Sequence, residues 1–130
     1  MHPGMLLIAE DNFINQKVIA AQLKLLGFTA EIACNGQEAL VLWRTGRFAA
    51  LLTDLQMPEM DGYDLAASIR REEGSGARMP IIALTANAVK QEADLCRAAG
   101  MDDFLTKPAT LTDLEAMLER HLGKAVAAGC

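Results

Sequence analysis

The chain has 130 residues, 52% apolar and 22% charged, a composition that predicts one folded domain with a substantial core and excludes a disordered chain. Its net charge of −5 argues against nucleic-acid binding, which depends on cationic contacts with phosphates. No apolar run is long enough to cross a membrane, so we expect no membrane contact by this domain. The three cysteines show no metal-binding or disulfide spacing, which favours a reducing, cytoplasmic compartment.

Short apolar runs alternate with segments of helical spacing along the chain, which is typical of βαβ units with a parallel sheet. The expected strands lie at 5–9, 28–33, 48–53, 79–84 and 102–106. A helix is expected after each of them, at about 14–25, 36–46, 62–73, 89–99 and 111–118. The pattern predicts a (βα)5 three-layer α/β sandwich. Right-handed crossovers restrict its topologies, and the expected strand order 2-1-3-4-5 places the first and third strands together where the order reverses. We expect a tail at 1–4, the domain at 5–122 and a flexible tail at 123–130.

Charged residues follow three of the expected strands. Glu10 and Asp11 end the first, Asp54 follows the third, and Lys107 follows the fifth. In an open parallel sheet, ligands bind beyond the carboxyl ends of the strands, where the strand order reverses. Acidic groups gathered there repel one another, by about 4 kcal/mol for a close pair at an effective dielectric near 20. The pattern therefore predicts either protonated acids or a divalent cation at this end of the sheet.

Each of these residues has an ordinary structural alternative when it is taken alone. Asp54 could cap the following turn, and Glu10 with Asp11 could be a solvated strand end. Thr85 could begin a helix, and Lys107 could be a surface lysine. Their joint occurrence at successive strand ends, in this order, favours one shared site.

Four segments of the chain together resemble the receiver domain of two-component response regulators, over about residues 5–122. These segments are Ala9-Glu10-Asp11-Asn12, Thr53-Asp54-Leu55-Gln56-Met57-Pro58-Glu59-Met60-Asp61-Gly62, Leu84-Thr85-Ala86 and Leu105-Thr106-Lys107-Pro108. Each segment alone would be a weak signal, but the set is specific. The resemblance implies a flavodoxin-like fold and a role in phosphorelay signal transduction.

The resemblance implies that Asp54 is the nucleophile that accepts a phosphoryl group from a partner's phosphohistidine. It also implies Mg²⁺ (or Mn²⁺) as cofactor, because this ion takes carboxylates, waters and phosphate oxygens as ligands. The expected protein ligands are Glu10, Asp11, Asp54 and the main-chain carbonyl of Gln56. By the same resemblance the domain would catalyse its own phosphotransfer and dephosphorylation, whereas kinase activity would belong to a parent hybrid protein.

Further roles follow from the same resemblance. Thr85 and Lys107 would stabilise the phosphoryl group, and Thr85 with Phe104 would form the conformational switch. An ordinary strand aromatic is the alternative for Phe104. Gln56 and Asn87 would tune the lifetime of the acyl phosphate.

Two prolines belong to the same expectations. Pro58 would shape the loop that carries the Gln56 carbonyl, since it biases the residue before it away from helical angles. Pro108 matches a position that is cis in receiver domains.

The chain looks most like the receiver of a hybrid sensor histidine kinase, and its parent could be membrane-anchored. Its expected partner is then a histidine kinase or a histidine phosphotransfer domain, with a transient homodimer also allowed. Ile14, Asn15 and Val18 on the first helix would form the docking surface, the alternative being that Ile14 and Val18 face the core. A stand-alone response regulator and a non-phosphorylated interaction module are the other readings of the chain. A phosphatase or dehalogenase-type enzyme would need a second acid where Gln56 stands.

Overall fold

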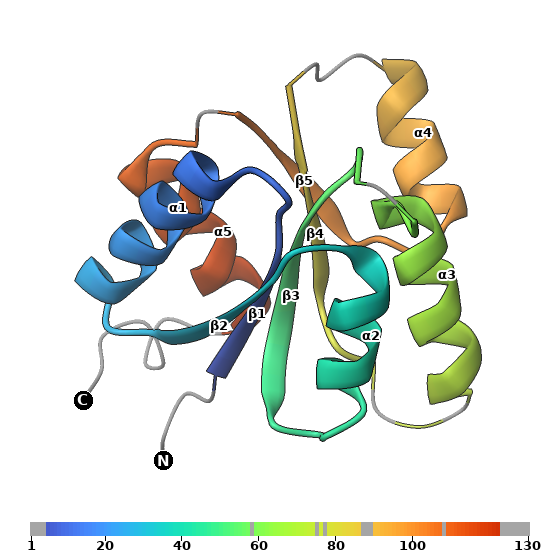
Figure 1. Ribbon diagram of the computed structural model, residues 1–130. Helices are drawn as coiled ribbons and strands as arrows, with labels where there is room; N and C mark the ends of the chain where they lie inside the picture. The colour runs from blue at the N-terminus through green and yellow to red at the C-terminus, as the bar shows by residue number, and fades with distance from the viewer. Residues whose placement is uncertain are drawn as a thin grey trace.

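The computed structural model contains one parallel sheet of five strands, β1 to β5 (Figure 1). It describes residues 5–57, 59–74, 76, 78–86, 90–107 and 109–122; both tails, Pro58, Asn87 and Pro108 lie outside them. The strands are β1 (Met5–Ala9), β2 (Thr29–Ala33), β3 (Phe48–Asp54), β4 (Ile81–Thr85) and β5 (Asp103–Thr106). They are ordered β2-β1-β3-β4-β5, so the predicted order is confirmed. All strands are parallel, and the order in which successive strands are added to the sheet reverses between β1 and β3.

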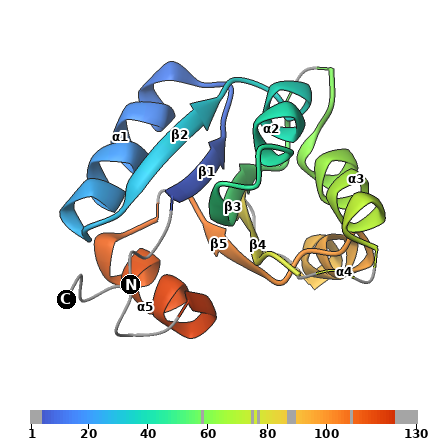
Figure 2. The ribbon, with the colours of Figure 1, turned by 90° about the horizontal axis from the view of Figure 1, so that it is seen from below.

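Helices cover both faces of the sheet, which gives the predicted three layers (Figure 2). The helices are α1 (Phe13–Leu25), α2 (Gly36–Trp43), α3 (Gly62–Glu73), α4 (Lys90–Ala98) and α5 (Leu111–Leu122). Helices α1 and α5 pack on one face, and α2, α3 and α4 pack on the other. Among the described residues, no helix combines the length and the apolar character needed to span a bilayer.

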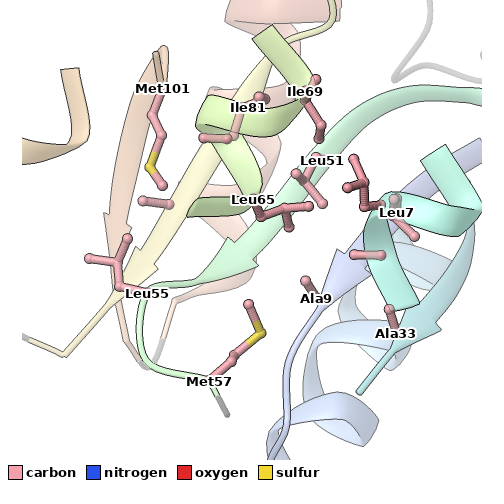
Figure 3. Close-up of a cluster of buried hydrophobic side chains, with 14 of the residues drawn as sticks. Leu7, Ala9, Ala33, Leu51, Leu55, Met57, Leu65, Ile69, Ile81 and Met101 are labelled. Carbon is pink, nitrogen blue, oxygen red and sulfur yellow. The ribbon is translucent and has the colours of Figure 1, made fainter. Parts of the chain in front are cut away.

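The core is divided by the sheet into two apolar layers. Leu7 of β1 and Leu51 of β3 point toward α2 and α3, where they meet Leu65 and Ile69 (Figure 3). Neighbouring positions on the same strands, such as Leu52, point to the other face and pack against α1 and α5. Since both faces are covered, the central strands are continuous apolar runs rather than alternating ones.

Helix α1 exposes two apolar residues, Ile14 and Val18, as their expected place on a docking surface requires. Ile14 is 70% and Val18 is 49% exposed, whereas Ile19 and Leu23 are buried. The core-facing alternative for Ile14 and Val18 is therefore wrong. The helix carries apolar residues on more than one stripe, and packing against the sheet and α5 decides which stripe is buried.

Three strands, β2, β4 and β5, begin one or two residues later than their apolar runs predict. Phe28 is buried but lies outside β2, because its N–H donates to Leu23 O in the turn that follows α1. Gly27 has φ 90 at this turn, a conformation that favours glycine. Asp102 lies before β5, where its N–H donates to Ile81 O.

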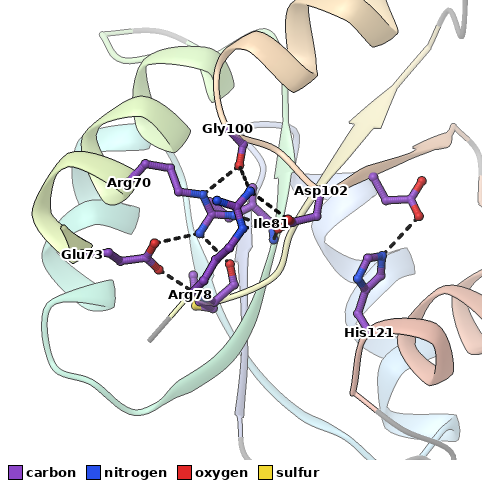
Figure 4. A network of polar contacts seen from close by, with 9 residues as sticks. Arg70, Glu73, Arg78, Ile81, Gly100, Asp102 and His121 are labelled. Carbon is purple, nitrogen blue, oxygen red and sulfur yellow. Dashed lines mark hydrogen bonds and ion pairs between the residues drawn. The ribbon is translucent and has the colours of Figure 1, made fainter. Parts of the chain in front are cut away.

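A buried guanidinium joins α3 to β4 and the turn before β5 (Figure 4). Arg70, with 14% of its side chain exposed, donates to Gly100 O and Met79 O at 2.8 Å each. It also pairs with Glu73 at 2.8 Å and with Asp102 at 2.7 Å. These contacts lie at the end of the sheet opposite the strand ends that carry Glu10 and Asp54. Their role is therefore to hold the fold together.

A second polar contact in Figure 4 joins α5 to the start of β5. His121 Nε2 lies 3.2 Å from Asp103 Oδ2, and Arg120 pairs with the same oxygen at 2.9 Å. Burial acts to raise the pKa of the Asp103 carboxyl, but hydrogen bonds from His121, the Phe104 N–H and Arg120 outweigh it and leave that pKa lowered.

Candidate functional site

The register of the sheet brings the acidic strand ends together. Strands β1 and β3 pair up to Ala9 and Thr53, so that the next residues, Glu10 and Asp54, end adjacent strands at one level. Both are largely buried, with 1% and 8% of their surface exposed. The predicted convergence of these carboxylates follows directly from this pairing.

Lysine 107 reaches the same point from the other side of the switch in strand order. Thr85 and Thr106 are paired at the ends of β4 and β5, and the N–H of Lys107 donates to Thr85 O at 2.6 Å. The side chain then extends across the strand ends. Its Nζ lies 3.1 Å from Glu10 Oε1 and 3.2 Å from Asp54 Oδ2.

Lys107 and Glu10 influence each other's ionisation. Burial raises the pKa of Glu10, and the N–H of Asn12 and the Lys107 ammonium only partly offset this effect. Burial lowers the pKa of Lys107, but the Glu10 and Asp54 carboxylates outweigh burial and leave its pKa raised. Lys107 is therefore charged at neutral pH, when it lies between two acids.

Three carboxylates form a cluster at this end of the sheet. One oxygen from each of Glu10, Asp11 and Asp54 lies within 4.8 Å of the others. Asp11 is exposed, in contrast with the other two acids. An all-oxygen set of this size, open to solvent on one side, suits a hard divalent cation that keeps some of its waters.

The Glu10 carboxylate is held by the turn into α1. Its Oε2 accepts the Asn12 N–H at 3.0 Å, and its main-chain oxygen accepts Gln16 Nε2 at 2.6 Å. Asn12 also caps α1 by accepting the N–H of Asn15, as its position predicts. The same short segment therefore starts the helix and orients the acid.

The loop after β3 is pressed against the start of α3. A Cβ at Gly62 would lie 2.3 Å from Asp54 O, so only glycine allows this approach. Asp61 caps the helix by accepting the N–H of Asp64 at 2.9 Å. Gln56 is exposed, and its N–H lies 3.5 Å from Asp54 Oδ1. These contacts fix the main chain on both sides of Asp54.

A cleft of about 330 Å³ opens beside Asp54 and is bounded by β4, α4 and Lys107. Thr85, which is 4% exposed, ends β4 on its wall. The Thr85 hydroxyl donates a hydrogen bond to the carboxylate of Glu92, which also lines the cleft. Sequence reasoning missed Glu92. Its only sequence signal was an acid in the first turn of the helix after Thr85, a common stabilising feature of helices.

Phe104 and Tyr63 lie near the cleft on the side of α4. Phe104 is half-buried and packs against the core layer that contains Leu7 and Leu51. It lines a small cavity of about 30 Å³ together with Cys96. Tyr63 of α3 lies beside the Cys96 thiol, and so brings α3 against α4.

Tyr63 gives a direct check on this packing. Burial raises the pKa of Tyr63 to about 12, and the neighbouring Cys96 and Glu92 add to the effect. The folded state therefore holds the phenol proton longer than the unfolded chain, whose tyrosine titrates near ~10. The contribution of the Tyr63 phenol to folding stability is therefore fully present below the unfolded pKa of ~10, and it falls as the pH rises from there toward about 12. Tyr63 is the only tyrosine, so the ultraviolet absorbance of tyrosinate should rise near pH 12. A transition near ~10 in the folded protein would contradict the described packing.

A second hollow, a groove of about 340 Å³, lies between α1 and the segment after β5. Asn15 and Val18 of α1 line one side, and Ala109 lines the other. Glu10 and Lys107 lie at its end, so the groove leads to the acid cluster. Val18, one of the exposed apolar residues of α1, therefore lines a groove that also contains Glu10 and Lys107.

The fold and these strand ends define the class of protein. Residues 6–119 match the response regulator receiver domain family, and the chain belongs to this family. Curated relatives include the hybrid signal transduction protein dokA of Dictyostelium discoideum, 44% identical over 87% of this chain, and the sensor histidine kinase RcsC of Escherichia coli, 39% identical over 82%. The matched parts are 7% and 11% of those proteins, so the chain corresponds to a small part of each.

Two solved structures show the same architecture. The receiver domain of the sensor histidine kinase PA1611 from Pseudomonas aeruginosa, with magnesium in its active-site cleft, has a TM-score of 0.84 and 39% identity, covering 92% of this chain and 98% of that one. The receiver domain of Ssk1 from Saccharomyces cerevisiae was crystallised with the histidine phosphotransfer protein Ypd1. That structure has a TM-score of 0.87 and 31% identity, covering 97% of this chain and 94% of the matched one.

Proposed function

We propose that this chain is the phospho-acceptor domain of a two-component phosphorelay and that Asp54 is the acceptor. The observation that carries the proposal is the placement of the Asp54 carboxylate between a cation and other acids. Lys107 Nζ lies 3.2 Å from Asp54 Oδ2, and oxygens of Glu10 and Asp11 lie within 4.8 Å. Family membership supports the same role.

The acid cluster fits a divalent metal, and we assign Mg²⁺ (or Mn²⁺) to Glu10, Asp11 and Asp54, with the main-chain carbonyl of Gln56 as a further ligand. The donor set is made of oxygens alone, which suits hard cations such as Mg²⁺ and Mn²⁺. When bound, such an ion neutralises charge and binds phosphoryl oxygens during transfer. The magnesium-bound relative supports this assignment.

The residues of the chain then have separate tasks in the transfer. An oxygen of Asp54 attacks the phosphorus of a partner's phosphohistidine, the new P–O bond replaces the P–N bond, and the imidazole leaves with its electron pair and takes up a proton. Lys107 pairs with the phosphoryl oxygens, and the Thr85 hydroxyl donates to one of them. Most of the catalytic effect comes from positioning and charge stabilisation.

The domain would then respond to phosphorylation as a two-state switch. Movement of Thr85 toward the phosphoryl group would open space behind β4, and Phe104 would turn inward to fill it. Phe104 is half-buried and therefore has a surface left to bury. We assign Gln56 and Asn87 to control of water access and hence of the acyl-phosphate lifetime. Pro58 and Pro108 lie outside the described residues, so a loop-shaping role for Pro58 and a cis bond at Pro108 stay predictions.

We assign docking of a histidine phosphotransfer domain or a histidine kinase to the exposed face of α1. Ile14, Asn15 and Val18 lie on this face, beside the groove that leads to Lys107. The Ssk1 structure with Ypd1 supports a partner of this kind. By similarity to the hybrid kinases, we propose that residues 5–122 serve as the receiver of a hybrid sensor histidine kinase and act in the cytoplasm.

The test is direct phosphorylation. With Mg²⁺ and acetyl phosphate, the protein should gain the mass of one phosphoryl group, and removal of Mg²⁺ with a chelator should abolish the gain. Asp54→Asn should gain none, because an amide is not a nucleophile here. Asp64→Asn on the exposed start of α3 is the matched control and should behave like the parent protein. A folded protein that gains no phosphoryl group would instead be an interaction module without this chemistry.

A further inference from the structure

We propose that Glu92 competes with the phosphoryl group for the Thr85 hydroxyl, and that this competition sets how readily Asp54 is phosphorylated. The inference rests on the proposed function, because it concerns the same cleft. It gives Glu92 a positioning role that neither the motifs nor the fold assign.

The present acceptor of the Thr85 hydroxyl and the expected site of phosphorylation line the same cleft. Asp54 and Glu92 both line the cleft, with Thr85 on the wall that they share. The Thr85 hydroxyl donates to a Glu92 carboxylate oxygen. A phosphoryl group on Asp54 would occupy the same cleft and would offer further charged acceptors.

A hydroxyl carries a single hydrogen, so Thr85 can donate to only one acceptor at a time. Both acceptors carry negative charge and therefore form hydrogen bonds of the stronger class. The hydrogen bond from Thr85 to Glu92 must therefore break before the hydroxyl can donate to the phosphoryl group.

Release of Glu92 also changes how α4 is held. Glu92 lies in the first turn of α4, so its bond to Thr85 ties the start of this helix to the end of β4. Cys96, one turn further on, stays buried beside Tyr63 of α3. Phosphorylation would thus free the first turn of α4 while its middle stays anchored, which gives the switch a defined moving part.

The experiment measures binding of beryllofluoride, a stable stand-in for the phosphoryl group, in the presence of Mg²⁺ by ¹⁹F NMR. Glu92→Ala should bind it about tenfold more tightly, the effect of losing one competing charge-assisted hydrogen bond. Glu92→Gln should lie between the parent and Glu92→Ala, because a neutral amide oxygen still accepts but more weakly. Glu115→Ala, which removes an exposed carboxylate from α5, should leave the affinity unchanged.

A double-mutant cycle separates competition from simple charge repulsion. In the Thr85→Ala background, Glu92→Ala should change the affinity by less than about twofold, since no hydroxyl remains to compete for. A tenfold gain that persists there, or no gain in Glu92→Ala itself, would overturn the inference while leaving the proposed function intact. A folded parent protein that binds no beryllofluoride would overturn both. Thermal melting of each variant checks that α4 remains folded.

Discussion

Replacement of Lys107 by methionine should slow phosphorylation of Asp54 by at least about 100-fold and should strengthen Mg²⁺ binding at the same time. The rate falls because the only described ammonium beside Asp54 is lost, and removal of one such charge-stabilising donor typically costs two to three powers of ten. Methionine keeps most of the apolar stem, so the change removes mainly charge.

The affinity for Mg²⁺ should rise because the Lys107 ammonium takes up space at the site and already neutralises part of the carboxylate charge that would bind the ion. Its Nζ lies 3.1 Å from Glu10 and 3.2 Å from Asp54, and a positive charge there repels a divalent cation. The affinity for Mg²⁺ should rise by about tenfold, a fraction of the full Coulomb energy at this separation. Isothermal calorimetry with Mg²⁺ and mass spectrometry with acetyl phosphate give the two numbers. Lys24→Met, at an exposed position near the end of α1, is the control for both.

If Lys107 has the role assigned to it, the variant must be phosphorylated more slowly and must bind Mg²⁺ more tightly. Loss of both Mg²⁺ affinity and phosphorylation would mean that the lysine mainly holds the strand ends in place. Unchanged phosphorylation would remove Lys107 from the transfer step. Melting curves with and without Mg²⁺ add a third check, since the variant should gain more stability from the ion than the parent does.

Replacement of Arg70 by methionine should cost about 3–5 kcal/mol of unfolding free energy, the usual effect of removing one partner from a buried ion pair. Arg70 donates to Gly100 O and Met79 O and pairs with Glu73 and Asp102. Without it, Met79 O and Glu73 Oε1 lose the donor described for them, while Gly100 O and Asp102 keep the more exposed Arg78 as a partner. Chemical denaturation followed by circular dichroism measures the change, and the slope with denaturant should remain the same.

Arg44→Met provides a matched control for this prediction. Arg44 pairs with Glu72 at 2.6 Å, but both side chains are well exposed, at 52% and 36%. Water solvates both partners when such a pair is broken, so the loss of stability should be much smaller than for Arg70→Met. Equal losses in the two variants would show that the Arg70 network is no stronger than a surface pair. Phosphorylation of Asp54 should survive Arg70→Met below its melting temperature, since the network lies at the other end of the sheet.

The strand ends were predictable from the sequence because each strand is a short apolar run with a chemically distinct residue after it. Glu10, Asp54 and Lys107 were placed correctly at the ends of β1, β3 and β5. The parallel order then required them to converge. The face of α1 could not be predicted in the same way, since α1 carries two apolar stripes. The stripe through Ile19 and Leu23 was buried instead of the one through Ile14 and Val18.

The hydrogen bond between Thr85 and Glu92 could not be predicted from the sequence either. It joins the end of a strand to a helix that begins after a loop, and side-chain distances across such a loop depend on how the helix packs. The same holds for Arg70, which meets Asp102 only because α3 and the turn before β5 lie side by side. Contacts of this kind leave no periodic pattern in the chain.

The sequence by itself determined the alternation of strands and helices, the order of the sheet and the acids and lysine at its carboxyl edge. Local hydrophobic periodicity places the strands and helices, and the handedness of crossovers restricts the order of the sheet to a few choices, of which the resemblance to receiver domains indicates one. Only the tertiary structure decided which stripe of α1 is exposed and which acid holds the Thr85 hydroxyl. These depend on packing between elements distant in the chain, where small differences in burial and hydrogen bonding select one arrangement from several that the sequence allows.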